Sequence, residues 1–241
     1  MNVASRFKQL FGFVPPVPQD NPARNPTSSE FEVDGWALSR FVIEVLVPKA
    51  GWHPFPLPEL MLMSGTVCRL KPSLIFEWGT NIGKSAWIFQ ETARHYRIPC
   101  EVHSMDLPPT QDHIEHPGSR RGEMVRGLAG VVLHEGDGLA TALEIWNSRG
   151  RDPRPLFFVD GDHSYESVKR ELDGILQAVP EASVLLHDTF YQSPDSGYNV
   201  GPRQAIEETL AAHPGRFGSL HTGTSLPGMT LLTPRIGARF S

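Results

Sequence analysis

From residue 60 onward, short apolar runs alternate with stretches in which apolar side chains recur every three or four residues. Short apolar runs are typical of buried strands, and the longer spacing is typical of helices with one buried face. The pattern predicts five strands, at residues 73–78, 101–106, 131–134, 156–160 and 183–188. It predicts a helix after each strand, at residues 84–96, 123–128, 139–149, 165–179 and 203–213. Such alternation predicts a parallel sheet with helices on both faces.

The last part of the chain has a different pattern. Two apolar runs, at residues 217–222 and 229–233, are separated by a segment that begins and ends with glycine and contains no helical stretch. Strands joined by a short turn pair antiparallel. The chain therefore has the pattern of an α/β, Rossmann-like fold in which a mostly parallel sheet finishes with an antiparallel strand.

The N-terminal part is rich in proline, because residues 1–59 contain nine of the 22 prolines. Proline opposes regular structure. We therefore predict a proline-rich arm with one helix over residues 1–59 and a ligand-binding domain over residues 60–241. The arm packs against the domain in the simplest interpretation; a lid over the site and a homodimer contact are the alternatives.

One helix is predicted within the arm. Asp34 is placed to cap it, and Phe41 and Leu46 follow at helical spacing. We expect this helix to end at Pro48, because proline lacks the N–H that a helix interior needs. Residues 54–58, which contain three prolines, are predicted to be a connector.

A glycine-containing loop follows the first predicted strand, in the sequence Phe76-Glu77-Trp78-Gly79-Thr80-Asn81-Ile82-Gly83-Lys84-Ser85-Ala86. Glycine lets the backbone approach a ligand closely, and the start of the next helix offers free N–H groups. A phosphate-binding loop needs four residues between its glycines, but only three separate Gly79 from Gly83. A dinucleotide-binding loop needs a glycine where this chain has Asn81.

Glu77 favours a third ligand. A carboxylate before the loop repels phosphate and attracts a cation. S-adenosylmethionine carries an ammonium and a sulfonium group and no phosphate, so it suits this loop. A strand-to-helix turn without a ligand is the alternative for this motif alone.

Acidic residues also end the next two predicted strands. In parallel sheets, ligands bind beyond the carboxyl ends of the strands. Asp106 is placed there to accept hydrogen bonds from both ribose hydroxyls of a nucleoside, and Asp137 to reach an adenine amino group. Three acids at successive strand ends behind a glycine loop favour a bound ligand over solvated loop carboxylates.

The chain resembles class I S-adenosylmethionine-dependent methyltransferases over roughly residues 60–234. It is most similar to the small-molecule branch that contains sugar O-methyltransferases and the cephalosporin hydroxylase group. Besides the glycine loop, the resemblance is carried by Phe158-Val159-Asp160-Gly161-Asp162-His163-Ser164-Tyr165 and Leu186-His187-Asp188-Thr189. It implies a seven-stranded sheet with an antiparallel last strand, S-adenosylmethionine as cofactor and a small-molecule substrate.

The resemblance also implies which residues bind the cofactor. Glu77 and Gly79 would hold the methionine end, Asp106 the ribose and Asp137 the adenine region. The complete set of predicted cofactor-binding residues is Glu77, Gly79, Thr80, Asn81, Gly83, Ser85, Asp106, Asp137 and Asp160.

Candidate catalytic residues follow the fourth and fifth strands. If these strands are neighbours, Asp160 and Asp188 lie about 5 Å apart, close enough to share a divalent cation such as Mg²⁺. The ion would lower the pKa of a substrate hydroxyl. His163 is the predicted general base, because imidazole titrates near neutrality, and Asp162 is the competing base.

His187 departs from the related sugar methyltransferases, which have an acid at the aligned position. Imidazole suits Mn²⁺, iron or zinc better than Mg²⁺. The predicted metal ligands are Asp160, Asp188 and His187. The alternative is that the aspartates cap loops and the histidines make structural hydrogen bonds.

Composition narrows the class of protein. With 22 basic and 27 acidic side chains the formal charge is −5, which disfavours a nucleic-acid binder. Two cysteines cannot form a disulfide framework and fit a reducing cytoplasm. The apolar run at residues 10–14 is too short for a signal core, and no run suits a membrane helix. We therefore predict a cytoplasmic protein without nucleic-acid or membrane partners.

The predicted function is methyl transfer from S-adenosylmethionine to a hydroxyl of a small molecule. Two loops, at residues 108–122 with His113 and His116 and at residues 189–202, are placed to act as lids. One alternative is a nucleotide-phosphate enzyme that uses the Gly83-Lys84-Ser85 sequence. The other is a non-catalytic module that binds the cofactor without transferring the methyl group.

Overall fold

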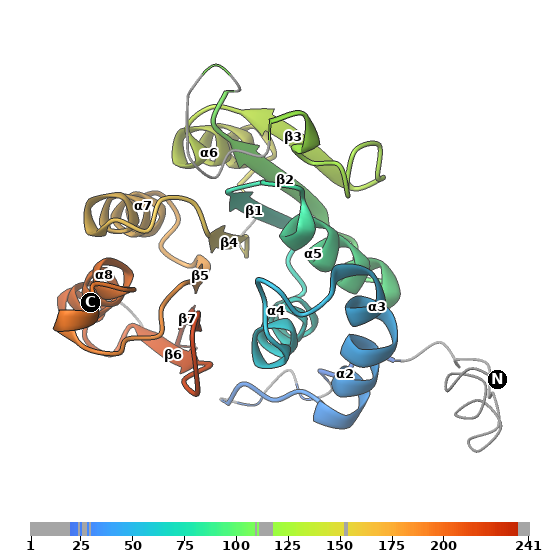
Figure 1. Cartoon of the computed structure of the whole chain (residues 1–241), viewed down its shortest axis with the longest axis horizontal. Helices are drawn as coiled ribbons and strands as arrows, with labels where there is room; N and C mark the ends of the chain where they lie inside the picture. Colours follow the sequence, from blue (N-terminus) through green and yellow to red (C-terminus); the bar gives the residue numbers. More distant parts are fainter. Residues whose placement is uncertain are drawn as a thin grey trace, which may run out of the picture.

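The computed structural model describes residues 20–23, 25, 28, 30–108, 110, 118–151 and 154–235. The predictions for residues 10–14, His113 and His116 lie outside these residues. In the described part of the chain, a single sheet is covered by helices on both faces (Figure 1).

The sheet has seven strands in the order β3-β2-β1-β4-β5-β7-β6. Its strands are β1 Leu74–Trp78, β2 Glu101–Asp106, β3 Val131–Glu135, β4 Leu156–Val159, β5 Ser183–His187, β6 Phe217–His221 and β7 Met229–Pro234. The first five pair in parallel, and β7 runs antiparallel to both β5 and β6. The predicted fold class and the antiparallel last strand are confirmed.

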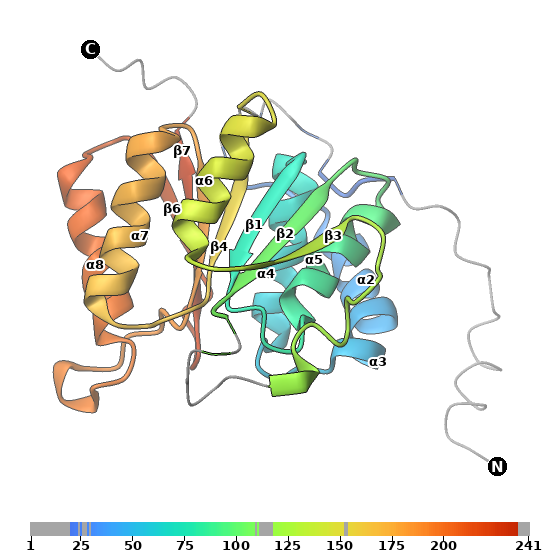
Figure 2. The ribbon, with the colours of Figure 1, turned by 90° about the horizontal axis from the view of Figure 1, so that it is seen from above.

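Two helical layers enclose the sheet, as Figure 2 shows from above. The layers comprise α2 Gly35–Phe41, α4 Leu57–Leu70 and α5 Lys84–His95 on one face, and α6 Gly138–Ser148, α7 Tyr165–Ala178 and α8 Val200–Ala212 on the other. Each layer has its own buried cluster, with Phe158 and Phe89 in the first and Phe157 and Leu172 in the second. The alternation of Phe157 and Phe158 between clusters follows from the twofold repeat of a strand.

The N-terminal helical segment begins as predicted and ends later. The Asp34 carboxylate accepts hydrogen bonds from the first N–H groups of α2. The helix then passes through a π-helical turn, Val42–Leu46, and continues as α3, Val47–Ala50. The expected end at Pro48 is wrong, because proline is tolerated in the first turn of a new segment and the wide π turn removes the normal hydrogen-bond register before it.

Helix α4 was not predicted. It begins at Leu57, inside the expected connector, and its first turn tolerates Pro58 because the N–H groups there need no helical partner. The expected boundary at residue 59 falls within this helix. Leu38, Phe41 and α4 side chains share one buried cluster with the sheet. The division into an arm and a domain stays a prediction.

The helix predicted at residues 123–128 is wrong. These residues form hydrogen-bonded turns, and the neighbouring Gly122, Gly127 and Gly130 all have positive φ angles. Glycine adopts this left-handed conformation readily and ends helices. None of the helices in the described part of the chain is both long enough and apolar enough to cross a membrane.

Candidate active site

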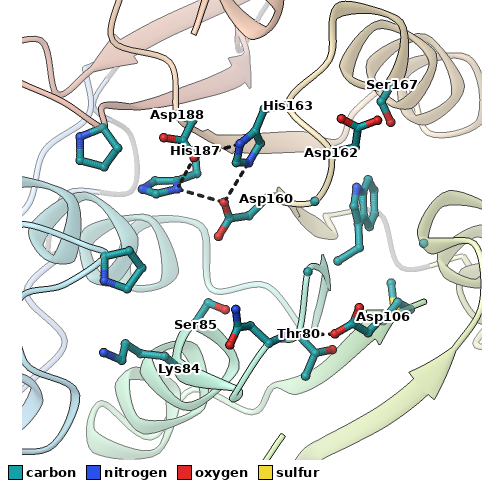
Figure 3. Close-up of a pocket in the computed structure, with 18 of the residues that line it drawn as sticks. Thr80, Lys84, Ser85, Asp106, Asp160, Asp162, His163, Ser167, His187 and Asp188 are labelled. Carbon is teal, nitrogen blue, oxygen red and sulfur yellow. Dashed lines mark hydrogen bonds and ion pairs between the residues drawn. The ribbon is translucent and has the colours of Figure 1, made fainter. Parts of the chain in front are cut away.

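A cavity of about 1130 Å³ lies at the carboxyl ends of β1 to β5. Lining residues lie at the end of each of these strands or directly after it, so the topology itself places the polar strand ends around one space. The N-terminal segment also contributes, because Trp52 to Pro56 line the same cavity. Figure 3 shows the labelled side chains around it.

Gly79 makes the closest approach in the loop between β1 and α5. It has a φ of 94°, and a Cβ placed there would lie 2.1 Å from the carbonyl oxygen of Asp160. Any side chain would therefore force the two strand ends apart. Gly83, with a φ of 86°, precedes the first turn of α5. The backbone N–H of Gly122 donates to the Asn81 carbonyl and braces the loop from outside.

Glu77 lies beneath this loop and is not among the residues that line the cavity. The Ser104 hydroxyl donates to its Oε1 at 2.6 Å and lies 2.7 Å from the Thr80 hydroxyl. Burial raises the pKa of Glu77 to about 7, although hydrogen bonds from Ser104 and Ser85 oppose the shift. Thr80 and Ser85 do line the cavity, so the loop faces it while Glu77 supports the loop from below.

Asp106 lies at the end of β2 and lines the cavity beside the loop. Its Oδ2 accepts a hydrogen bond from the Asn81 backbone N–H at 3.2 Å, and its Oδ1 accepts one from Leu107 at 2.8 Å. Arg121 lies 3.7 Å away. The carboxylate is therefore held in place with acceptor capacity left for a ligand.

Asp137 lines the cavity next to β3 and has two structural partners. Its Oδ1 accepts a hydrogen bond from the N–H of Ala140 and so caps α6, and its Oδ2 pairs with Arg170 at 2.8 Å. Glu171, which was not predicted, lines the same end and is 4% exposed. Burial raises the pKa of Glu171 to about 7, although a hydrogen bond from the Trp78 indole N–H and the charge of Arg170 both lower it.

Asp160, His187 and Asp188 converge at the ends of the neighbouring strands β4 and β5. Each offers one atom suited to a metal ion, and these atoms lie within 4.8 Å of one another. His187 Nδ1 lies 2.9 Å from Asp160 Oδ1 and 3.3 Å from Asp188 Oδ2. Figure 3 shows the Asp160 carboxylate pointing towards both His187 and His163.

Glu59 completes this cluster from α4 and is only 2% exposed. Its Oε2 lies 3.0 Å from His187 Nε2, and its Oε1 accepts a hydrogen bond from the Gly228 N–H at 2.8 Å. A metal ion at Nδ1 would require neutral His187 with its proton on Nε2, where Glu59 would accept it, and the Nδ1 lone pair would then face the two aspartates. This donor set therefore fits a divalent cation, because a carboxylate behind a ligating histidine fixes its tautomer.

The sequence contained no local signal for Glu59. It follows two prolines in a segment predicted to be a connector, and 128 positions separate it from His187. Only the packing of α4 against the sheet reveals the contact.

His163 lies at the edge of this cluster. Its Nδ1 is 3.2 Å from Asp188 Oδ2 and its Nε2 is 3.6 Å from Asp160 Oδ1. Burial lowers the pKa of His163, but the hydrogen bond to Asp160 and the charges of Asp188 and Asp160 outweigh it, and the net shift is upward. Asp162 instead accepts hydrogen bonds from Ser164 at the start of α7 and lies apart from the cluster (Figure 3).

His187 is the most strongly perturbed group of the cluster. Burial opposes its protonation, but Asp160, Asp188 and Glu59 together raise its pKa well above the usual value. Burial alone would raise the pKa of Asp188, yet the hydrogen bond and charge of His187 lower it. The cluster is therefore held by opposite charges.

Comparison with known proteins identifies the domain that contains most of this site. Residues 76–189 match a family model described as a methyltransferase domain. No curated protein matches the chain in sequence. Similar solved structures include the O-methyltransferase of Bacillus cereus in complex with S-adenosylhomocysteine, with 17% identity over 82% of this chain and 90% of that chain and a TM-score of 0.53.

Two further structures share the fold. TomG of Streptomyces achromogenes, an O-methyltransferase involved in tomaymycin synthesis and bound to S-adenosylmethionine, is 20% identical over 96% of this chain and 95% of that chain, with a TM-score of 0.50. The methyltransferase PaMTH1 of Podospora anserina, bound to S-adenosylhomocysteine, is 19% identical over 78% and 87%, with a TM-score of 0.51. The matched segment 76–189 contains the glycine loop and both aspartates of the cluster, and this part of the chain is a methyltransferase domain.

Proposed function

We propose that the chain transfers the methyl group of S-adenosylmethionine to a hydroxyl oxygen of a small molecule, with His163 as the general base. The observation that carries this proposal is the position of His163 between Asp160 and Asp188, at the edge of the cavity that the glycine loop also lines. Two carboxylates beside an imidazole favour its protonated form and so strengthen it as a proton acceptor.

The reaction needs few groups from the protein. A lone pair of the acceptor oxygen forms the new O–C bond, the S–C bond breaks with its electrons moving to sulfur, and the hydroxyl proton passes to His163. The cavity aligns the two reactants and excludes water, which accounts for much of the acceleration in such transfers.

The proposal includes a divalent cation, Mg²⁺ or Mn²⁺, held by Asp160, His187 and Asp188. Bound there, it would lower the pKa of the acceptor hydroxyl. The convergence of two carboxylates and one imidazole supports this, as does the position of Glu59 behind His187. Calorimetry of the chelator-treated protein with Mn²⁺ tests this cation site. We expect saturable binding that Asp188→Asn weakens at least tenfold. Absence of binding would exclude the cation from the proposed mechanism.

The transferase proposal is tested with methyl-labelled S-adenosylmethionine and a panel of phenols, diols and sugars. We expect transfer to at least one hydroxyl and a loss of 10²- to 10⁴-fold in kcat for His163→Gln, the usual contribution of a general base. His213→Gln is the control, because His213 follows α8 and is not among the lining residues. Cofactor binding without transfer to any acceptor would favour the non-catalytic module.

Four further predictions concern a phosphate ligand, the location of the protein, its oligomeric state and its long loops. The nucleotide-phosphate alternative has little support, because the Lys84 amine donates to the His53 carbonyl and acidic side chains outnumber basic ones around the cavity. A cytoplasmic location and a homodimer stay predictions. Lid roles for the two long loops also stay predictions.

A further inference from the structure

The cavity has an apolar wall on the side of the carboxylate cluster. Among the described residues, nine large apolar side chains are exposed, and three of them line this cavity: Trp52 at 68%, Tyr198 at 46% and Leu226 at 39%. They come from three separate segments of the chain. Exposed apolar side chains that converge on one cavity from different segments are typical of a binding surface for an apolar ligand.

Each of the three segments that form this wall contacts the carboxylate cluster. The Tyr198 hydroxyl donates to Asp188 Oδ1 at 3.0 Å. The Phe55 ring packs edge-on against His187, with 4.9 Å between centroids. Gly228, two residues after Leu226, is bound through its N–H to Glu59. A flat ring that rests on the wall therefore lies beside the cluster.

The charge of the cavity restricts the ligand further. Six acidic side chains are among its described lining residues: Asp106, Asp137, Asp160, Asp162, Glu171 and Asp188. The lysine and arginine side chains on the same lining, Lys84 and Arg170, bind the His53 carbonyl and the Asp137 carboxylate. Apart from the divalent cation proposed at the cluster, an anionic group that entered the cavity would meet a described lining with more acidic than basic side chains, and both basic ones already have partners.

We propose that the methyl acceptor is an uncharged or cationic molecule that carries its hydroxyl on a flat apolar ring, and that anionic acceptors such as nucleotide sugars and coenzyme A thioesters are excluded. This inference rests on the proposed hydroxyl methylation and names its substrate class. The apolar wall binds the ring, and the acidic lining selects its charge.

A charge series on one ring tests the proposal. The probes are 3,4-dihydroxybenzylamine, 3,4-dihydroxybenzyl alcohol and 3,4-dihydroxyphenylacetate, which share the same hydroxyls and differ in the charge of one substituent. We expect kcat/KM for the amine and the alcohol to exceed that for the acetate at least tenfold, and the difference to shrink at high salt. An acetate that reacts as well as the amine would overturn the proposal while leaving hydroxyl methylation intact.

Binding is measured separately, by calorimetry of the three probes with protein saturated in S-adenosylhomocysteine. The expected order of affinity without any transfer would support the acceptor class and contradict the proposed reaction. Failure of the amine and the alcohol to bind would overturn the acceptor class, whatever the catalytic result.

Trp52→Ala tests the wall. We expect KM for the benzyl alcohol to rise at least fivefold with kcat little changed, because the indole supplies binding and not chemistry. Trp36→Ala is the matched control, since Trp36 is 90% exposed and not among the lining residues. Unchanged S-adenosylhomocysteine affinity shows that both variants keep the fold. Equal KM values for the two variants would contradict the role of Trp52.

Discussion

The two halves of the cavity are built in different ways. On the side predicted to bind the cofactor, the backbone largely positions the loop from Gly79 to Gly83 and Asp106, through a positive φ, the start of α5 and N–H groups that bind a carboxylate. On the proposed acceptor side, the cluster of Glu59, Asp160, His163, His187 and Asp188 is held by side chains from three segments.

Because of this difference, we expect substitutions in the two halves to damage the protein in different ways. Backbone geometry depends on a few residues that are close in sequence, so a substitution there distorts one loop. The cluster depends on opposite charges buried together, so removal of one partner leaves another buried and unpaired. Substitutions in the two halves therefore distinguish a distorted loop from an unpaired buried charge.

Gly79→Ala is expected to have the largest effect. The new Cβ would meet the Asp160 carbonyl at 2.1 Å, so the cofactor loop and the end of β4 must separate. We expect S-adenosylhomocysteine binding to be lost and the free energy of unfolding to fall by about 3 kcal/mol or more. Gly127→Ala is the control, because its φ is 77° but nothing lies within 4 Å, and it should cost only about 1 kcal/mol. Equal losses in urea denaturation would contradict the steric argument.

Glu59→Ala is expected to destabilise the cluster by about 3–5 kcal/mol, because it leaves His187 buried between fewer carboxylates and the Gly228 N–H without its partner. Glu59→Gln keeps a carbonyl acceptor and should cost less than half as much. Urea denaturation of both variants in chelator gives the comparison. A cost below about 1 kcal/mol for the alanine variant would show that water replaces the carboxylate.

Glu171 makes stability depend on pH. Its pKa is about 7 in the folded protein and 4.5 in the reference state, so the folded state holds the proton more tightly. Its stabilising contribution is complete below about pH 4.5 and is lost as the pH rises through 7, by up to about 3 kcal/mol. Glu171→Gln should flatten this part of the profile, measured by urea denaturation from pH 5 to 8.

Part of the slope should remain in Glu171→Gln, because burial also raises the pKa of Glu77 to about 7. Glu166→Gln, on the first turn of the same helix, serves as the control for the loss of a negative charge on α7. If the unfolding free energies of wild type and Glu171→Gln changed with pH in parallel, Glu171 would not be the cause of the pH dependence.

Asp137 should give the smallest effect. Asp137→Ala removes the cap of α6 and the pair with Arg170, and should cost about 1 kcal/mol. Asp137→Asn keeps the cap, because asparagine is an equally good N-cap, and should cost about half as much or less. Thermal unfolding compares them, and the S-adenosylhomocysteine affinity of Asp137→Asn tests the predicted adenine contact. An unchanged affinity would leave Asp137 a purely structural role.

Much of the fold could be predicted from apolar spacing. The strands at residues 156–159 and 183–187 lie where the apolar runs indicated, since a strand buried on both faces needs a nearly continuous run. The helix at residues 123–128 was wrong because glycine conformation overrode the spacing of apolar residues there. Helix α4 was missed because prolines at its start suggested a loop, although the first turn of a helix tolerates them.

Local spacing and backbone conformation account for the alternation of strands and helices, the glycine loop and the acids at the strand ends, so these features could be predicted from the chain alone. The packed structure was needed to reveal that Glu59 supports His187, that Glu77 lies beneath the loop and that Trp52 lines the cavity. Such contacts join residues far apart in the chain. They follow from how whole helices pack on the sheet, and no short sequence pattern encodes that packing.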